Sequence, residues 1–236
     1  MPKSGFDGFP KECIRFYKGL KKNNTKVWFE EHRGEFDDYV MIPARLFVGE
    51  MGARLKKLSA GVHADPRVDK SIFRIFRDTR FSKDKTPYKT HLGIWFWEGD
   101  GPRMECSGFY FHLDPPKLML GVGIYMFPRH MIDEYRNSVV HEKYGKELTR
   151  IISKITKIPG CNIGRRHYKR VPRGFDPDHK NAELLMMNGF YGGIETTIPK
   201  ELHISGIIDY CYDRYKPFVP LHKWIVGVTK RATKTR

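Results

Sequence analysis

Cysteine and long apolar runs are both scarce in this 236-residue sequence. No two cysteines form a Cys-x-x-Cys pair, which argues against a zinc ribbon or a redox motif and suits a reducing compartment. The longest apolar run, around residues 118–127, is too short and too rich in glycine to cross a bilayer. The first residues, MPKSGFDG, lack the apolar core of a secretion signal. We therefore expect a soluble, cytoplasmic protein with no membrane partner. The cysteines are Cys13, Cys106, Cys161 and Cys211.

Motifs of the common catalytic and cofactor sites are also missing. There is no Gly-x-Ser-x-Gly elbow and no lysine-bearing phosphate loop, and the Gly-x-Gly at residues 121–123 lacks the setting of a dinucleotide fingerprint. His112 and Asp114 share one face of a predicted strand. His91 or His179 could complete a set of metal ligands, but nothing in the sequence specifies that third position. We assign no catalytic residue, no metal and no cofactor, and whether the protein is an enzyme stays open.

Basic residues dominate the composition, with 43 Lys and Arg against 27 Asp and Glu and a net charge of +16. Three short segments, residues 71–91, 161–180 and 229–236, each carry a net charge of +4. A basic balance concentrated in this way favours a phosphate-bearing partner. We expect the third segment to be a disordered, solvated tail that follows a single domain at residues 1–228.

Three motifs in this sequence resemble one known family. Residues 77–91 read RDTRFSKDKTPYKTH, and residues 168–179 read YKRVPRGFDPDH, followed by AELL at residues 182–185. Together with WFEEHR at residues 28–33, these runs are similar to the signatures of the family catalogued as domain of unknown function 2461. The matches cover most of the chain in order. The resemblance implies a single α+β domain and no particular activity.

The apolar patterns independently predict an α+β fold. Alternating residues indicate strands near residues 72–78, 93–97, 106–114 and 118–126, which we expect to form a mainly antiparallel sheet. Helical spacing predicts helices at both ends of the chain, packed with this sheet. No strand–helix–strand unit repeats, and this absence favours α+β over α/β.

The third and fourth strands are predicted to form a hairpin around two prolines at residues 115–116. Pairing Phe111 with Leu120 puts every large apolar side chain of both strands on one face. The opposite face then combines polar groups with glycines, and such a face suits a pocket floor because glycine lets a ligand or backbone approach closely. The predicted pocket-lining residues are Tyr110, His112, Gly121 and Gly123.

Residues 72–91 run from an apolar stretch into a dense cationic loop. Arg74 has apolar neighbours on its own strand face, so we expect it to be partly buried and to need an acceptor. In this loop arginines would bind phosphate through paired N–H groups, and lysines would add mobile charges. Alternatively, Arg77 and Arg80 pair with Asp78 and other acids and hold the loop in shape. The predicted anion-binding residues are Arg74, Arg77, Arg80, Lys83, Lys85 and Lys89.

A second basic segment, residues 168–179, mixes cations with aromatic and proline residues. This mixture suits stacking together with phosphate contact, as in binding of a nucleotide or a single strand. Alternatively, residues 174–177 form only a tight turn whose aromatic side chain packs inward. The predicted anion-binding residues of this segment are Lys169, Arg170 and Arg173.

The charges favour binding of a phosphate-bearing polyanion, either nucleic acid or a nucleotide, through a basic cleft. One alternative is an enzyme that acts on a small phosphorylated or carboxylated substrate in a pocket with Tyr110 and His112. A second is a structural or partner-binding protein with no anion site. The sequence leaves open the oligomeric state and whether the two basic segments form one site.

Overall fold

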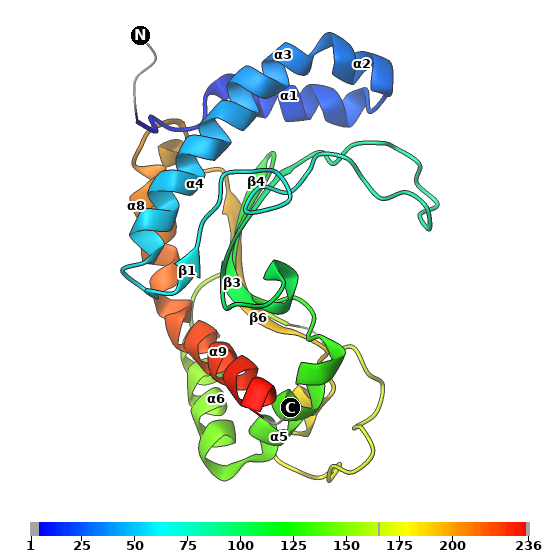
Figure 1. The fold of residues 1–236 in the computed structure, drawn as a ribbon, viewed down its shortest axis with the longest axis vertical. Helices are drawn as coiled ribbons and strands as arrows, with labels where there is room; N and C mark the ends of the chain where they lie inside the picture. The colour runs from blue at the N-terminus through cyan, green and yellow to red at the C-terminus, as the bar shows by residue number, and fades with distance from the viewer. Residues whose placement is uncertain (1–4, 165, 235–236) are drawn as a thin grey trace. The chain divides into compact units, whose positions relative to one another are not determined.

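A six-stranded antiparallel sheet combined with helices gives the protein an α+β fold (Figure 1). The structure, a computed structural model, describes residues 5–164 and 166–234. The strand order is β1-β2-β3-β4-β6-β5. The strands predicted near residues 93–97, 106–114 and 118–126 are confirmed as β2, β3 and β4. The strands are β1 Val62–His63, β2 Leu92–Glu98, β3 Ser107–Asp114, β4 Lys117–Ile124, β5 Cys161–Ile163 and β6 Phe190–Thr197.

Residues 72–78 do not form the regular strand that their apolar pattern predicts. Ile72 makes isolated bridges to Val68 and Ile94, Phe76 makes one to Tyr88, and Phe76 stays 50% exposed. A strand needs one continuous hydrogen-bonded partner. This segment changes partner along its length, because Phe73 N bonds to the Gly93 carbonyl whereas Arg77 N bonds to the Pro87 carbonyl. Arg74 is therefore exposed rather than partly buried.

Burial alternates along β3 and β4 in agreement with the predicted apolar face. The apolar residues of that face are at most 2% exposed. On the opposite face Tyr110 and His112 are half-buried. The buried residues are Phe109, Phe111, Leu113, Leu118, Leu120 and Val122.

Helices precede and follow the strands of the sheet in sequence. In the described ranges, no helix combines the length and apolar character that crossing a membrane requires. Pro43 lies at the start of α4, and the turn before it, Asp37–Met41, is π-helical, because proline has no N–H for the regular helical bond. The helices are α1 Lys11–Lys22, α2 Lys26–Glu31, α3 Arg33–Phe36, α4 Ile42–Leu55, α5 Arg129–Val140, α6 Glu142–Ile155, α7 Ala182–Leu185, α8 Ile207–Tyr215 and α9 Val219–Lys234, with short 3-10 turns at Arg103–Glu105, Lys200–His203 and Lys216–Phe218.

The basic C-terminal segment is helical as far as it is described, which corrects the expectation of a disordered tail at residues 229–236. α9 runs through Lys234, with Ala232 buried at 6% exposure. Arg231 Nε donates a hydrogen bond to Glu134 Oε1 at 2.8 Å. Burial of one face and this ion pair stabilise a helix that charge alone did not predict. Residues 235–236 lie outside the described ranges.

The internal contacts of the chain divide it into two compact units. Unit 1 contains residues 1–96, 110–120 and 196–214, and unit 2 contains residues 97–109, 121–195 and 215–236. Each unit is described by itself. The single domain expected at residues 1–228 stays a prediction.

Aromatic side chains form much of the core of unit 1. The Phe47 ring lies 4.8 Å from the Phe111 ring and 5.4 Å from the Phe9 ring, between centroids. α1 lies beside α2 and α3 (Figure 1), where the Phe16 ring is 5.6 Å from Trp28 and 5.5 Å from Phe36. Burying each such side chain stabilises the fold by about 1.5–3 kcal/mol.

In unit 2, helices α5, α6 and α9 pack together (Figure 1). The Tyr135 ring on α5 is fully buried and lies 6.1 Å from the Trp224 ring on α9. Trp224 Nε1 donates to the Tyr144 carbonyl at 3.0 Å, which joins α9 to α6. On α5, the Arg136 guanidinium carbon lies 5.2 Å from the Tyr168 ring centroid, which places this helix against the irregular segment of residues 166–177.

Candidate functional site

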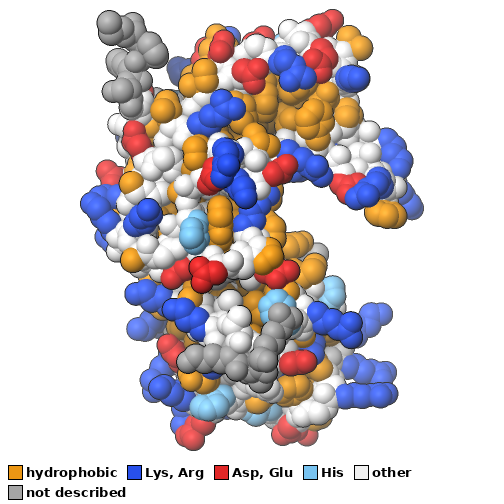
Figure 2. Space-filling model, in the orientation of Figure 1, with side chains coloured by type: hydrophobic (Ala, Val, Ile, Leu, Met, Phe, Trp, Pro, Cys, Tyr) orange, Lys and Arg blue, Asp and Glu red, His pale blue; other side chains and the backbone are white. Residues whose placement is uncertain are grey.

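Residues 74–89 of unit 1 are here called the basic loop, and residues 75–89 of this loop form a narrow hairpin. Lys89 N donates to the Ile75 carbonyl at 2.8 Å, and Arg77 N donates to the Pro87 carbonyl at 2.9 Å. Asn24 exchanges two hydrogen bonds with the backbone of Tyr88, at 2.9 and 3.1 Å, and so holds the base of the hairpin. Figure 2 shows Lys and Arg side chains along this loop with acidic side chains between them.

Arg77 is bound within the loop. Its Nη1 donates to Asp84 Oδ2 at 2.6 Å, to the Thr86 carbonyl at 3.1 Å and to the Thr86 hydroxyl. The N–H of Thr86, its hydroxyl and then Arg77 lower the pKa of Asp84 to about 2, so this carboxylate is ionised at neutral pH. The Arg77–Asp84–Thr86 network therefore shapes the loop, as the structural alternative predicts for Arg77.

Arg80 pairs with Asp78 at the surface. Its Nε and Nη2 donate to the two carboxylate oxygens at 3.0 and 2.7 Å. The Arg80 side chain and backbone N–H together lower the pKa of Asp78 to about 2. The Arg80 side chain is nevertheless 77% exposed, and an exposed pair of this kind is screened by water and salt. A phosphate could therefore replace Asp78 as its partner.

The other predicted cations of the loop are of two kinds. Lys85 Nζ donates to the Thr79 carbonyl at 2.9 Å, and Lys89 Nζ donates to the Arg74 carbonyl at 2.8 Å. Arg74 and Lys83 are exposed, and their side chains have no hydrogen bond or ion pair with the described residues. Only part of the charge in this loop is thus available to a partner.

Tyr110, His112 and His91 form a half-buried cluster in unit 1. The Tyr110 hydroxyl lies 2.9 Å from His112 Nδ1, and the two histidine rings lie 4.2 Å apart between centroids. Burial, with the nearby charges of His112 and Lys89, lowers the pKa of His91 to about 4, and burial raises the pKa of Tyr110 to about 12. His91 and Tyr110 are therefore neutral at pH 7.

Tyr110 packs closely against the backbone of β2 at Gly93. A Cβ added at Gly93 would lie 2.9 Å from the Tyr110 hydroxyl oxygen. No group of three or more His, Cys, Asp or Glu suited to hold a metal occurs in the part of the chain that the structure describes. The cluster thus resembles packed, hydrogen-bonded scaffolding.

The predicted pocket floor is divided between the two units. Tyr110 and His112 belong to unit 1, whereas Gly121 and Gly123 belong to unit 2. At Gly123, which has a φ of +138°, an added Cβ would lie 2.4 Å from the Phe190 carbonyl oxygen. The close approach of the β6 backbone accounts for this glycine without a ligand. A pocket that combines all four residues stays a prediction.

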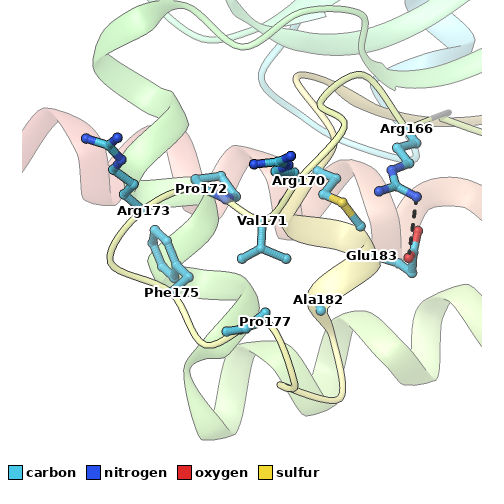
Figure 3. Close-up of a pocket in the computed structure, with 10 residues that line it drawn as sticks. Arg166, Arg170, Val171, Pro172, Arg173, Phe175, Pro177, Ala182 and Glu183 are labelled. Atoms are coloured by element: carbon cyan, nitrogen blue, oxygen red, sulfur yellow. Dashed lines mark ion pairs between the residues drawn. The ribbon is translucent and has the colours of Figure 1, made fainter.

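Unit 2 contains a pocket of about 470 Å³, here called the arginine pocket (Figure 3). It is built from the second basic segment and α7. In the view of Figure 3, Arg170 and Arg173 lie above Phe175 and Pro177. The pocket thus combines cations with an apolar surface. Its lining consists of Arg166, Arg170, Val171, Pro172, Arg173, Phe175, Pro177, Ala182, Glu183 and Met186.

Backbone hydrogen bonds hold the segment that lines this pocket. The N–H groups of His167 and Tyr168 both donate to the Met186 carbonyl at 2.9 Å. Phe175 N donates to the Pro172 carbonyl at 3.3 Å. The latter bond closes a turn at residues 172–175, which overlaps the turn predicted at residues 174–177 without coinciding with it. Phe175 is half-buried in the pocket wall.

The three arginines of the pocket differ in their partners. Arg166 Nε donates to the Tyr168 carbonyl at 3.1 Å, and its Nη2 donates to the Lys169 carbonyl at 2.6 Å. Its Nη1 lies 4.0 Å from Glu183 Oε1. Arg170 and Arg173 are exposed and make no ion pair or side-chain hydrogen bond with any residue in the described ranges. These two side chains are therefore the ones available to bind an anion.

Two of the three cations predicted in this segment line the pocket. Arg170 and Arg173 do so, whereas Lys169 is exposed outside it. The predicted set omits Arg166 and Glu183. Arg166 belongs to the same charge run and could have been included on that ground, but nothing local indicated that Glu183 would face it.

Ser107, His222 and Glu98 form a hydrogen-bonded row in unit 2. His222 Nδ1 lies 3.0 Å from Ser107 Oγ, and His222 Nε2 lies 2.8 Å from Glu98 Oε2. These residue types match a Ser–His–acid triad. Both Ser107 and His222 are 0% exposed, however, so no substrate reaches the hydroxyl. The row satisfies buried polar groups rather than forming an active site.

One comparison with known proteins assigns a family. The family described as "Conserved hypothetical protein (DUF2461)" matches residues 12–224, a range that includes both the basic loop and the arginine pocket. The search of curated proteins found no match. Because the match spans well over half of its length, the chain belongs to the family of domain of unknown function 2461.

Proposed function

We propose that the protein binds a phosphate-bearing ligand, a nucleotide or a nucleic acid, in the arginine pocket. The observation that carries this proposal is the combination of Arg170 and Arg173, which have no partner in the described residues, with the apolar lining around Phe175. The volume of about 470 Å³ falls within the range of roughly 300–1,000 Å³ that small-molecule sites occupy.

Each part of the pocket would meet a different part of a nucleotide. The guanidinium groups of Arg170 and Arg173 can each donate two parallel N–H bonds to a phosphate. Phe175 and Pro172 offer an apolar surface to a base or a ribose. Glu183, at the Arg166 side (Figure 3), can accept a hydrogen bond from an amino or hydroxyl group.

The net charge of +16 supports the same class of ligand. A positive field raises the local concentration of polyanions and the rate at which they bind. Arg74 and Lys83 of the basic loop add two exposed cations in unit 1. Binding of a nucleic acid to such a surface should weaken steeply as salt is added, because bound counterions are released.

The test measures affinity for ATP and for a fluorescent oligothymidylate, oligo(dT), at several salt concentrations. In the double variant R170A/R173A, we expect affinity for ATP to fall by about 100-fold, because hydrogen bonds to charged groups are lost. The slope of log K against log[salt] for oligo(dT) should fall by roughly 1 for each phosphate contact removed.

The matched control for this test is Arg150→Ala. Arg150 is exposed on α6 of the same unit and has no ion pair with the described residues. Its removal changes the net charge without touching the pocket, and affinity should change by less than about 3-fold. The proposal would be contradicted if neither ATP nor oligo(dT) bound at about 50 mM salt. It would also be contradicted if R170A/R173A and R150A lost affinity equally.

A further inference from the structure

The tip of the basic loop exposes an aromatic side chain that the fold does not use. Phe81 is 95% exposed, more than any other large apolar residue in the described ranges. Burial of a phenylalanine normally stabilises a protein, so an aromatic ring left in water contributes nothing to folding. Phe81 is therefore available for contact with a partner.

The tip that carries Phe81 is held in a defined shape. Ser82 N and Lys85 Nζ both donate to the Thr79 carbonyl, at 3.3 and 2.9 Å. The Arg77–Asp84–Thr86 network holds the residues on either side of the tip. Since the loop is ordered before binding, presenting the ring to a partner costs little additional conformational entropy.

Cations flank the exposed ring. The Arg80 guanidinium carbon lies 5.8 Å from the Phe81 ring centroid, and Lys83 is exposed two residues further on. Proteins that bind single-stranded nucleic acid stack its bases on aromatic side chains. Basic side chains next to those aromatics contact the adjacent phosphates. The arrangement of ring and charges at this tip fits that pattern.

A membrane surface fits the same tip less well. Asp78 and Asp84 lie three residues on either side of Phe81, and the pKa of each carboxyl group is about 2. Ionised carboxylates so close to the ring oppose its insertion into an apolar layer. A base stacked on Phe81 would leave both carboxylates in water.

We infer that Phe81 is a stacking residue for single-stranded nucleic acid, with one base against its ring and adjacent phosphates against Arg80 and Lys83. This inference rests on the proposed function and narrows the ligand from any nucleotide to a single strand. It assigns the basic loop a contact of its own, separate from the arginine pocket.

The experiment compares oligo(dT) affinity in the full chain for the wild type, F81A and F81W. F81A should weaken binding by about 5- to 150-fold, the range for loss of one base–aromatic stack. The salt slope should stay unchanged, because phenylalanine carries no charge. F81W should restore binding. Tyr125→Ala, which removes a 68% exposed aromatic from unit 2, serves as the control and should bind as the wild type does.

An oligonucleotide of the same length without bases distinguishes stacking from an indirect effect. The wild type and F81A should bind this abasic strand equally, since it offers nothing to stack on the ring. The inference is wrong if F81A binds oligo(dT) as tightly as the wild type, or if its loss is equally large on the abasic strand.

Failure of this inference can be separated from failure of the proposed function. If ATP binding depends on Arg170 and Arg173 while F81A leaves oligo(dT) binding intact, only the inference fails. If neither ATP nor oligo(dT) binds, the proposed function fails as well. Phe81-dependent sedimentation with vesicles of phosphatidylserine and phosphatidylcholine, without Phe81-dependent oligo(dT) binding, would overturn the inference in favour of a membrane contact.

Discussion

The basic loop and the arginine pocket belong to segments with the same net charge, but they use that charge differently. In the loop, Arg77 and Arg80 pair with Asp84 and Asp78. In the pocket segment, Asp176 instead accepts the backbone N–H of Asp178 at 2.9 Å, and neither Arg170 nor Arg173 pairs with a described residue. The availability of a cation therefore depends on what the nearby acids bind rather than on the charge count.

The largest expected difference between the two regions comes from removing two arginines from one region or the other. R170A/R173A should weaken ATP binding by about 100-fold, because Arg170 and Arg173 supply hydrogen bonds to the phosphates in the wild type. R77A/R80A should change ATP affinity by less than about 3-fold, since neither Arg77 nor Arg80 lines the arginine pocket and both pair with aspartates. Titration calorimetry with ATP measures both. Equal losses in the two double variants would remove the distinction between loop and pocket.

Neutralising the loop acids should make the loop behave more like the pocket. In D78N/D84N, the arginines lose their internal partners, and we expect oligo(dT) affinity at low salt to rise by about 10-fold with a steeper salt slope. The matched variant D176N/D178N changes the net charge equally but frees no arginine. Its gain should be smaller, and fluorescence anisotropy measures the difference.

A gain of similar size in both aspartate variants would show that total charge, not internal pairing, controls binding. The basic loop and the arginine pocket would then differ only in the shape of the surface that they offer to a ligand.

The smallest expected effect is a pH dependence confined to the loop. The pKa values of Asp78 and Asp84 are lowered to about 2 in the folded protein, against an ordinary aspartate value of 3.8. A carboxyl group whose pKa is lowered by folding stabilises the folded state fully when the pH is above its pKa in the unfolded chain. This contribution is lost as the pH falls through its pKa in the folded protein. The Thr86 amide resonance should therefore shift between about pH 4 and pH 2.

In D84N this Thr86 transition should disappear. The Phe175 amide, whose hydrogen bond involves no carboxylate, should not shift in that range. A Thr86 resonance that follows the same curve in D84N would contradict the assignment of the network to Asp84.

Much of the sheet could be predicted from local pattern. β3 and β4 alternate apolar and polar residues, and the apolar set is buried as expected. The same reasoning failed for residues 72–78, because alternation does not reveal whether a single partner strand continues beside the whole segment. It also failed for residues 229–234, where the run of charges hid a helix that packs through Ala232.

The candidate site was predicted in part. Arg170 and Arg173 were recognised from charge density, and they line the arginine pocket. Glu183 and Met186 were not, because they reach the pocket through the fold of residues 166–186. Phe81 was visible in the sequence, but nothing there distinguished an exposed aromatic from a packed one such as Tyr88, which is 2% exposed.

The sequence by itself determined the family through its motifs. It also determined the α+β class, the apolar strand face and the positions of the basic segments, since composition and periodicity are local properties of the chain. Only the tertiary structure decided which cations are available. Arg77 meets Asp84 because the loop folds back on itself, and Arg166 meets two carbonyls because its segment turns. Pairing depends on distances of a few ångströms between groups, and the path of the backbone sets those distances.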